Sequence, residues 1–375
     1  MSRGIVFRAA IYGGSGYADG NQDVLAGLEQ QALPLQVVPI GLQEDREGLL
    51  PPQRRRELAR LQRRNLALTE SVLYQCAPPG DFLLDLEARV RIGRTAFETD
   101  ALPPGWAERC NALDEIWVPS TFNRDSFARG GVAERRLRVM PEGLDTRRYR
   151  PGLAPLPIPE RRGFNFLSVF DWLDRKGPDV LLRAYCQAFR PDEDVALILK
   201  VHRFDDPGCD LEEHLVWVLE EQMGLRLQDI PPILLLCGLL PAKDMPRLYA
   251  SADAFVLPSR GEGWGRPYME AAAAQLPVLA TRWSGQTDFL NDQNSYLIDI
   301  ERVVEVPLTS DREIYLEQRW AEPSAEHLAQ LMRQVFDHRD EARARARQAR
   351  HDMVTLWDRQ VLAPRWGDAF RALLH

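Results

Sequence analysis

Two glutamates with seven residues between them, Glu262 and Glu270, stand in the segment Glu-Gly-Trp-Gly-Arg-Pro-Tyr-Met-Glu. An apolar run at 254–257 precedes this segment and another at 277–280 follows it, so we expect a strand, a glycine-rich turn, a helix and a strand. Pro267 suits the first turn of such a helix, because the N–H that it lacks has no helical partner there. Both carboxylates are then expected at the carboxyl end of parallel strands, where open α/β sheets bind ligands.

The turn between the glutamates adds a place for an anion. Gly263 and Gly265 leave backbone N–H groups open beside a helix N-terminus, which favours negative charge. Carboxylates accept strong, charge-assisted hydrogen bonds from neighbouring hydroxyl groups. Acceptors for sugar hydroxyls on either side of an anion-binding turn indicate a nucleotide-sugar site. Chance also produces this spacing, and Glu270 alone would suit a helix-dipole interaction, so the neighbouring sequence decides.

The sequence around the pair resembles the signature of retaining glycosyltransferase family 4, whose members have the GT-B fold. That family usually reads Glu-Gly-Phe-Gly-x-Pro-x-x-Glu-Ala, followed by a Pro-Val-Val-Ala strand and a turn that contains glycine. Here Trp264 takes the place of the Phe, Arg266 replaces a usually neutral residue, and Ser284-Gly285 supplies the later turn. The resemblance implies an α/β protein with two Rossmann-like, doubly wound domains that face a cleft.

The resemblance also implies which residues act. The first glutamate of the family motif contacts the sugar hydroxyls and the second holds the ribose, roles that fall to Glu262 and Glu270. Lys176, just before a helix in Asp-Arg-Lys-Gly-Pro, matches the family's phosphate-binding lysine, with an ordinary solvated turn lysine as the alternative. The further donor-binding candidates are turn residues and basic residues: Gly14, Ser15, Gly16, Arg175, Lys200, Gly263, Trp264, Gly265, Arg266, Ser284 and Gly285.

The chain departs from the family at the second phosphate ligand. Relatives usually have a Gly-Arg pair shortly before the lysine, but this chain has Phe170-Asp171 in register there. The second cation therefore has to come from another residue, and Arg175, Lys200 and Arg266 are the candidates. Asp171 could itself line the site.

A second departure concerns the first domain. Many relatives carry a histidine there, close to the reacting sugar, whereas all six histidines of this chain follow residue 200. Glu98, at the end of an expected strand, is the candidate catalytic residue that replaces it. A loop carboxylate without a catalytic role is the equal alternative for Glu98.

Strands and helices are expected to alternate twice along the chain, which is typical of parallel, doubly wound sheets. The opening turn, 13–18, resembles the Ser-Gly-Tyr-Ala opening of some bacterial glycosyltransferases. We expect an acceptor-side domain at 1–150, a proline-rich linker at 151–160 and a nucleotide-sugar-binding domain at 161–352. The last segment, 353–375, is expected to form a helix that crosses back to the first domain, with Pro364 kinking or dividing it. The other expected strands are 4–11, 35–40, 72–76, 90–97, 115–118, 137–141, 164–170, 196–201 and 233–239.

Composition narrows the function classes. The net charge of −8 gives no general case for nucleic-acid binding. Five scattered cysteines without a Cys-x-x-Cys pair argue against a disulfide framework or a structural zinc site and favour a reducing, cytoplasmic location. The longest apolar run, 233–240, is too short to span a bilayer. The arginine-rich segments 54–64 and 343–347 could dock on an anionic membrane, but acidic neighbours favour a solvated helix surface.

Together these features predict a retaining hexosyltransferase that uses a UDP- or GDP-sugar and needs no cofactor or metal. Asp85-Leu86-Glu87 and Asp205-Asp206 imitate the metal-binding Asp-x-Asp of another glycosyltransferase fold, but the doubly wound second half argues against that fold. The alternatives are another GT-B enzyme, such as a phosphorylase or an epimerase, and a non-catalytic subunit that binds a nucleotide sugar. The acceptor and the oligomeric state stay open.

Overall fold

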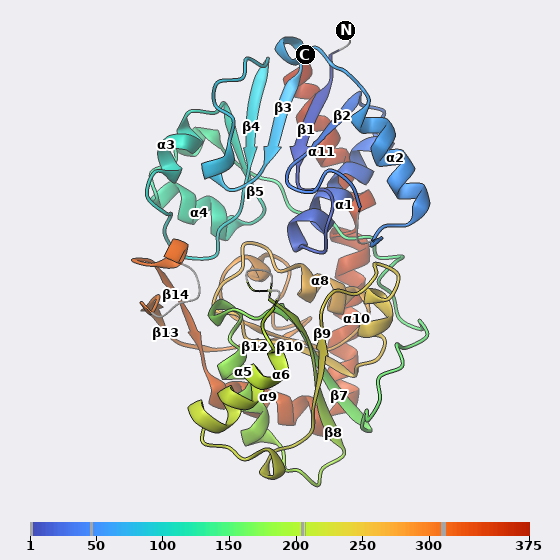
Figure 1. Ribbon diagram of the computed structural model, residues 1–375, viewed down its shortest axis with the longest axis vertical. Helices are drawn as coiled ribbons and strands as arrows, with labels where there is room; N and C mark the ends of the chain where they lie inside the picture. The colour runs from blue at the N-terminus through green and yellow to red at the C-terminus, as the bar shows by residue number, and fades with distance from the viewer. Residues whose placement is uncertain (1–2, 46–47, 204–205, 207, 309–312) are drawn as a thin grey trace. The chain divides into compact units, whose positions relative to one another are not determined.

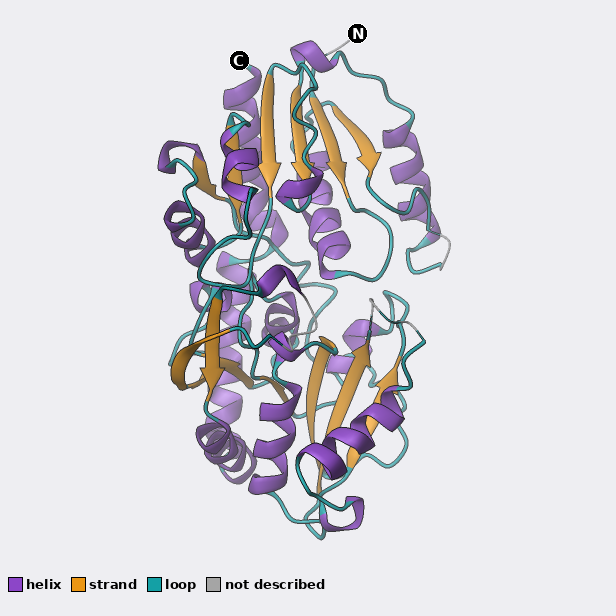
Figure 2. Ribbon diagram, turned by 60° about the vertical axis from the view of Figure 1, so that its left-hand side comes forward, coloured by secondary structure: helices purple, strands orange, loops and turns teal. Residues whose placement is uncertain are grey.

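The computed structural model describes residues 3–45, 48–203, 206, 208–308 and 313–375. The chain forms two compact units: Met1–Asp145 with Leu240–Ala242 and Thr355–His375, and Thr146–Leu239 with Lys243–Val354. Each unit contains a six-stranded sheet with helices beside it (Figure 1 and Figure 2). The sequence-based prediction of two Rossmann-like, doubly wound parallel sheets is confirmed.

The sheet of the first unit has the strand order β2-β1-β3-β4-β5-β6, and all neighbouring pairs are parallel. Parallel neighbours need crossover connections, which are mostly helices here. The strands are β1 (Ile5–Ala9), β2 (Leu35–Pro39), β3 (Val72–Cys76), β4 (Val90–Arg94), β5 (Glu115–Val118) and β6 (Leu137–Val139). The helices are α1 (Gly16–Gln30), α2 (Pro52–Gln62), α3 (Trp106–Asn111), α4 (Thr121–Arg129) and α11 (Arg359–Leu374).

An aromatic core joins this sheet to α11. Tyr74 of β3 stacks on Phe7 of β1 with 4.6 Å between the ring centroids and meets Trp366 and Phe370 of α11 edge-on at 6.2 and 5.8 Å. Of the two effects expected of Pro364, a kink or a division, division is wrong, because α11 is assigned as one helix with the proline inside it. Burial of its aromatic face against the sheet offsets the backbone hydrogen bond that proline removes.

The sheet of the second unit has the strand order β12-β11-β10-β7-β8-β9, again with parallel neighbours. Its inner strand β8 is a continuous buried apolar run from Val195 to Leu199, as expected for a strand covered on both faces. The strands are β7 (Phe164–Asp171), β8 (Val195–His202), β9 (Ile233–Cys237), β10 (Ala254–Leu257), β11 (Val278–Thr281) and β12 (Tyr296–Ile298). The helices are α5 (Pro178–Ala188), α6 (Leu211–Trp217), α7 (Met245–Tyr249), α8 (Arg266–Ala273), α9 (Ala325–Asp337) and α10 (Arg339–Leu356).

An antiparallel pair, β13 (Ile300–Glu305) and β14 (Arg319–Pro323), lies outside the parallel sheet of the second unit. These two strands were not predicted from the sequence. Among the residues that the structure describes, no helix is both long enough and apolar enough to cross a membrane.

Candidate active site

The strand order of the second sheet reverses between β7 and β10. From β7 the chain adds β8 and β9 on one side, and β10, β11 and β12 then extend the other side. Because β7 and β10 are parallel, the loops that follow them leave the same edge of the sheet. Open α/β sheets bind ligands at the carboxyl ends of their strands where the order reverses. The loop after β7 carries Arg175 and Lys176, and the loop after β10 carries Glu262.

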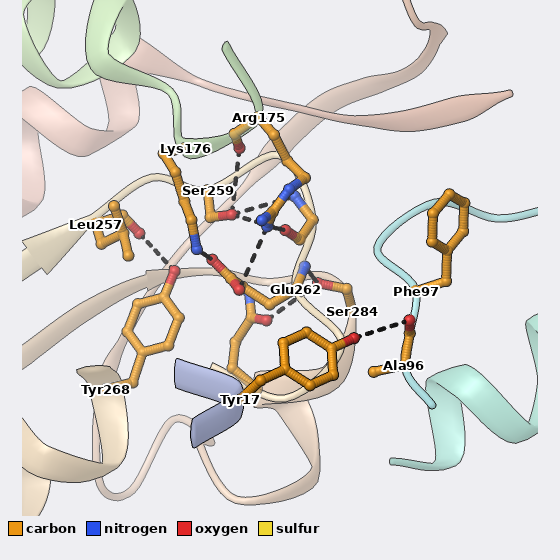
Figure 3. A network of polar contacts seen from close by, with 12 residues as sticks. Tyr17, Ala96, Phe97, Arg175, Lys176, Leu257, Ser259, Glu262, Tyr268 and Ser284 are labelled. Atoms are coloured by element: carbon orange, nitrogen blue, oxygen red, sulfur yellow. Dashed lines mark hydrogen bonds and ion pairs between the residues drawn. The ribbon is translucent and has the colours of Figure 1, made fainter. Parts of the chain in front are cut away.

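Glu262, in the loop after β10, forms an ion pair with two basic residues of the turn after β7 (Figure 3). Lys176 Nζ donates to Glu262 Oε1 at 2.5 Å, and Arg175 Nη1 lies 3.4 Å from Glu262 Oε2. All three side chains are at most 11% exposed. The structure therefore brings together the first glutamate of the motif, the predicted phosphate lysine and one candidate for the second cation.

The carboxylate of Glu262 is held in its charged form. Burial alone would raise the pKa of this carboxyl group, but the positive charges of Lys176 and Arg175 outweigh burial and lower the pKa below its ordinary value. A carboxylate in this state accepts hydrogen bonds and donates none. It can therefore receive sugar hydroxyl groups.

Glycines allow the loops of the site to approach closely. Gly177 has a φ of +67°, and a Cβ there would lie 2.3 Å from the carbonyl oxygen of Pro258. A Cβ on Gly285 would lie 2.2 Å from the carbonyl oxygen of Gly263. Ser284 has a φ of +74°, which is strained for a residue with a side chain, and its Oγ accepts the backbone N–H of Glu262 at 2.9 Å. The predicted Ser284-Gly285 turn thus holds the backbone of the catalytic candidate.

Arg260, in the loop after β10, links this loop to three other parts of the second unit, and sequence reasoning missed it. Its guanidinium bonds both carboxylate oxygens of Asp179 at 2.9 and 2.8 Å and both of Glu322 at 2.9 Å. It also donates to the carbonyl oxygen of Asp174 at 2.6 Å. These partners belong to α5, β14 and the turn with Lys176. Their sequence separations of 62 to 86 residues leave no local signal.

Glu270 lies inside α8, in a nearly buried position with one identified phenol partner. Tyr249 Oη donates to Glu270 Oε2 at 2.7 Å, and burial followed by the charge of Glu270 raises the pKa of Tyr249. The neighbouring Trp264 packs on Phe289 with 5.0 Å between ring centroids, so its side chain contributes to the core. Gly265 has a φ of +95° and precedes the first helical residue of α8.

The remaining cation candidates of the second unit are also buried. Arg266 is the first residue of α8 and is 8% exposed. Lys200 of β8 is 3% exposed, and its Nζ donates to the carbonyl oxygen of Gly238. Burial lowers the pKa of Lys200 to about 8. At the ends of β7 and β8, Asp171 Oδ1 lies 4.0 Å from His202 Nε2.

The candidates of the first unit lie in loops after β1 and β4. Ser15 caps α1 by accepting the N–H of Ala18 at 3.2 Å, and Gly14 and Gly16 flank it. Tyr17 Oη donates to the carbonyl oxygen of Ala96 at 3.5 Å (Figure 3).

Glu98 is half-buried in the loop after β4. This strand ends at Arg94, three residues before the expected end at 97. Asn123 Nδ2 donates to the carbonyl oxygen of Phe97 at 2.5 Å, which holds residues 95–98 as a loop. The structure thus places Glu98 and the Gly14–Gly16 turn in a different unit from Lys176 and Glu262.

The acidic motifs weighed as metal sites do not form a cluster in the described part of the chain. Among those residues, no group of three or more His, Cys, Asp or Glu side chains could hold a metal ion. Asp205 of the second motif lies outside the described residues.

Residues 162–306 match the family "Glycosyl transferases group 1". This segment contains Lys176, Lys200, Glu262, Glu270 and Ser284. Over 245 residues the chain is 28% identical to the GDP-mannose-dependent alpha-(1-6)-phosphatidylinositol monomannoside mannosyltransferase of Mycolicibacterium smegmatis, covering 60% of this chain and 61% of that protein. Over 160 residues it is 30% identical to the D-inositol 3-phosphate glycosyltransferase of Corynebacterium jeikeium, covering 40% of this chain and 36% of that protein. The chain thus spans less than two thirds of the length of these relatives.

Solved structures resemble the chain over nearly its whole length. Sucrose-phosphate synthase from Thermosynechococcus elongatus superposes with a TM-score of 0.68 at 15% identity, covering 99% of both chains. HepE of Anabaena in complex with UDP-glucose gives a TM-score of 0.63 at 15% identity, covering 98% of this chain and 99% of that one. At this identity the likeness shows the fold alone, which is the GT-B fold predicted from the sequence.

Proposed function

We propose that this chain is a retaining glycosyltransferase that moves a hexose from a nucleotide-diphosphate sugar to an acceptor hydroxyl without a metal ion. The observation that carries the proposal is the buried contact between Lys176 and Glu262 at the switch point of the second sheet. The contact joins a cation for phosphate to an acceptor for hydroxyls, inside the segment that matches the glycosyl transferase family.

The chemistry of the two side chains allows both to bind a donor while they remain close. An ammonium group donates up to three hydrogen bonds, so Lys176 can serve Glu262 and a phosphate oxygen together. A carboxylate offers about four acceptor positions, so Glu262 can hold Lys176 and receive sugar hydroxyls. The sugar and the diphosphate would then lie on either side of this contact.

The nucleoside would be held through Glu270. Its carboxylate, oriented by Tyr249, can accept hydrogen bonds from the two ribose hydroxyls. We propose a UDP- or GDP-sugar as the donor, because HepE was solved with UDP-glucose and the M. smegmatis relative is named as GDP-mannose-dependent. The first unit would supply the acceptor side, with Glu98 contacting the acceptor or the sugar.

In the proposed reaction the acceptor hydroxyl attacks the anomeric carbon from the face that the diphosphate leaves, which retains the configuration. The bond between this carbon and the phosphate oxygen breaks, and its electron pair goes to the diphosphate. A phosphate oxygen takes the proton of the hydroxyl. Lys176 stabilises the negative charge that develops on the leaving group, which is the main demand of this step.

A donor panel tests the proposal. The thermal midpoint of the protein is measured with UDP-, GDP- and ADP-sugars, since a ligand at a hundred times its Kd stabilises the native state by about 2.7 kcal/mol. Lys176→Ala and Glu262→Gln should abolish transfer, whereas Lys243→Ala, which changes an exposed lysine of the same unit, should not. Absence of binding or hydrolysis with every donor, or unaltered activity in both site variants, would contradict it.

Two further measurements separate the finer parts of the proposal. The anomeric configuration of the product, followed by NMR before it equilibrates, should equal that of the donor. Activity should persist in excess EDTA, because lysine side chains take the place of a metal at the diphosphate. A product with inverted configuration would contradict the retaining mechanism, and loss of activity in EDTA would contradict the absence of a metal ion. Neither result would contradict the transfer reaction itself.

A further inference from the structure

An acidic residue and a histidine end the two neighbouring strands β7 and β8. Asp171 and His202 are register partners in this parallel pair, and their side chains are only 14% and 20% exposed. Asp171 Oδ1 lies 4.0 Å from His202 Nε2. Because side chains alternate along a strand, Lys200 lies on the same face of β8 as His202. The pair therefore stands at the carboxyl edge of the sheet, and Asp171 ends the strand that leads to Lys176.

The cations already described at this edge are partly committed. Lys176 and Arg175 share the negative charge of Glu262, so the three side chains together carry one net positive charge. Lys200 donates to the carbonyl oxygen of Gly238. A nucleotide diphosphate brings at least two negative charges, so its binding calls for another positive group at this edge.

We propose that His202 is a diphosphate-binding residue that takes up a proton when the donor diphosphate binds, with Asp171 holding the imidazolium that results. This inference rests on the proposed function and names the second cation of the same site. A histidine suits the role because a change in its surroundings moves its charge across the physiological pH range. At 4.0 Å, Asp171 needs only a small movement to form a charged contact with the protonated ring.

The electrostatics of the ligand-free protein keep His202 neutral. Burial lowers its pKa most, Asp171 opposes burial, and Lys200 and Lys176 lower it further, to about 4. From β9, Cys237 also faces Lys200, but burial raises the pKa of this thiol, so it stays uncharged. A bound diphosphate neutralises the two lysines and adds negative charge, which raises the pKa of His202. At a pH between the pKa of His202 in the ligand-free protein and its pKa in the complex, His202 takes up a proton from solvent when the diphosphate binds.

Calorimetric titration of the whole chain with UDP and with GDP, in buffers of different ionisation enthalpy, measures this proton. At pH 6 the wild type should take up nearly one proton more than His202→Gln, and proton release by the nucleotide itself cancels in that difference. His202→Gln should also bind the nucleotide about tenfold more weakly at pH 6, the loss expected for one charge-assisted hydrogen bond. The proton uptake and the nucleotide affinity of the two proteins should become equal above the pKa of His202 in the nucleotide complex.

Two variants separate this role from simple packing. Asp171→Asn should reduce the proton uptake, whereas a carboxylate that only repels the diphosphate would leave uptake unchanged and tighten binding when neutralised. His214→Gln is the matched control, because His214 packs on Trp172 in the same unit with 5.3 Å between ring centroids, and it should keep the wild-type uptake.

The outcomes are distinguishable. Nucleotide binding with equal proton uptake in the wild type and His202→Gln overturns the role of His202 and leaves the glycosyltransferase proposal intact. Failure of the wild type to bind any nucleotide overturns both. If His202→Gln does not fold, NMR titration of the wild-type imidazole decides, since its pKa should rise when UDP is added, and an unchanged pKa refutes the inference.

Discussion

Lys176 Nζ and Glu262 Oε1 lie 2.5 Å apart although 86 residues separate them along the chain. The contact joins the loop after β7 to the loop after β10, and both side chains are almost buried. A buried ion pair adds little net stability when it is complete, but removing one partner strands the other charge. Stability alone therefore gives little reason for the pair, which supports the proposed role of both residues in binding phosphate and sugar.

Lys176→Met should lower the free energy of unfolding by about 3 kcal/mol, because Glu262 then keeps only Arg175 as an identified cationic partner. The double variant Lys176→Met/Glu262→Gln should recover part of this loss, since residue 262 is then uncharged and Arg175 keeps its hydrogen bond to the carbonyl oxygen of Gly261. Denaturation of the four proteins of this double-mutant cycle measures the coupling. Additive effects of the two substitutions would show that the contact carries no coupling energy.

The stability contributed by Glu262 should depend on pH. Its folded-state pKa lies below the ordinary value of 4.5, so the folded protein is favoured wherever the carboxylate is charged. This contribution is fully present above pH 4.5 and is lost as the pH falls through the lower pKa of the folded state. The difference in thermal midpoint between the wild type and Glu262→Gln should therefore shrink from pH 7 to pH 3.5. A constant difference over this range would contradict the charged, paired state of Glu262.

Local patterns were enough to predict most of the fold and part of the site. The continuous apolar runs of β10 and of Val195–Leu199 in β8 could be recognised in the sequence, because a strand buried on both faces needs apolar residues throughout. Glu262 and Glu270 could be predicted from the sequence because a single loop and its helix carry both. Their partners Tyr249 and Ser284 could not, since these residues approach the glutamates only when separate elements pack.

The pairing of Asp171 with His202 shows why the contacts between separate elements could not be predicted from the sequence. Each residue is visible as a polar end to an apolar run, but their contact follows from the register of β7 on β8. Register depends on the packing of the whole sheet, which a single sequence does not specify locally. Arg260 is hidden for the same reason, because its two carboxylate partners come from α5 and β14.

Arg260→Lys should destabilise the second unit by about 2 kcal/mol and weaken donor binding. A lysine cannot reproduce the paired bonds to Asp179 and Glu322, and it releases the turn that carries Lys176. Arg282→Lys is the matched control, because Arg282 also forms a two-bond contact, with Asp292, but at an exposed site. Its cost should stay below about 1 kcal/mol. Equal thermal midpoints for the two variants would contradict the prediction that Arg260 stabilises the turn that carries Lys176.

Gly285→Ala should lower both thermal stability and donor affinity. Its Cβ would lie 2.2 Å from the carbonyl oxygen of Gly263, so the two turns must move apart and Glu262 moves with them. Gly80→Ala provides the comparison, because a Cβ at that position meets nothing within 4 Å and φ is not positive. This control should be neutral or slightly stabilising, through the smaller entropy of its unfolded state. Thermal midpoints with and without UDP distinguish the two cases.

Tyr249→Phe should weaken nucleotide binding through Glu270. The substitution removes the phenol that donates to Glu270 Oε2 at 2.7 Å, which costs about 1–3 kcal/mol for a buried acceptor and loosens the carboxylate. The matched control is Tyr268→Phe, since Tyr268 is equally buried but donates to the backbone carbonyl of Leu257.

The decisive measurement for Tyr249 is the ratio of the Kd values of 2′-deoxy-UDP and UDP. If Glu270 holds the ribose, the wild type should prefer UDP by about tenfold, the value of one charge-assisted hydrogen bond. Tyr249→Phe should reduce this preference, whereas Tyr268→Phe should lose stability and keep it. A preference that survives in Tyr249→Phe but disappears in Glu270→Gln would mean that the carboxylate acts without the phenol. A preference unchanged in both would remove Glu270 from the ribose site, because a residue that binds the hydroxyls cannot be altered without changing their contribution.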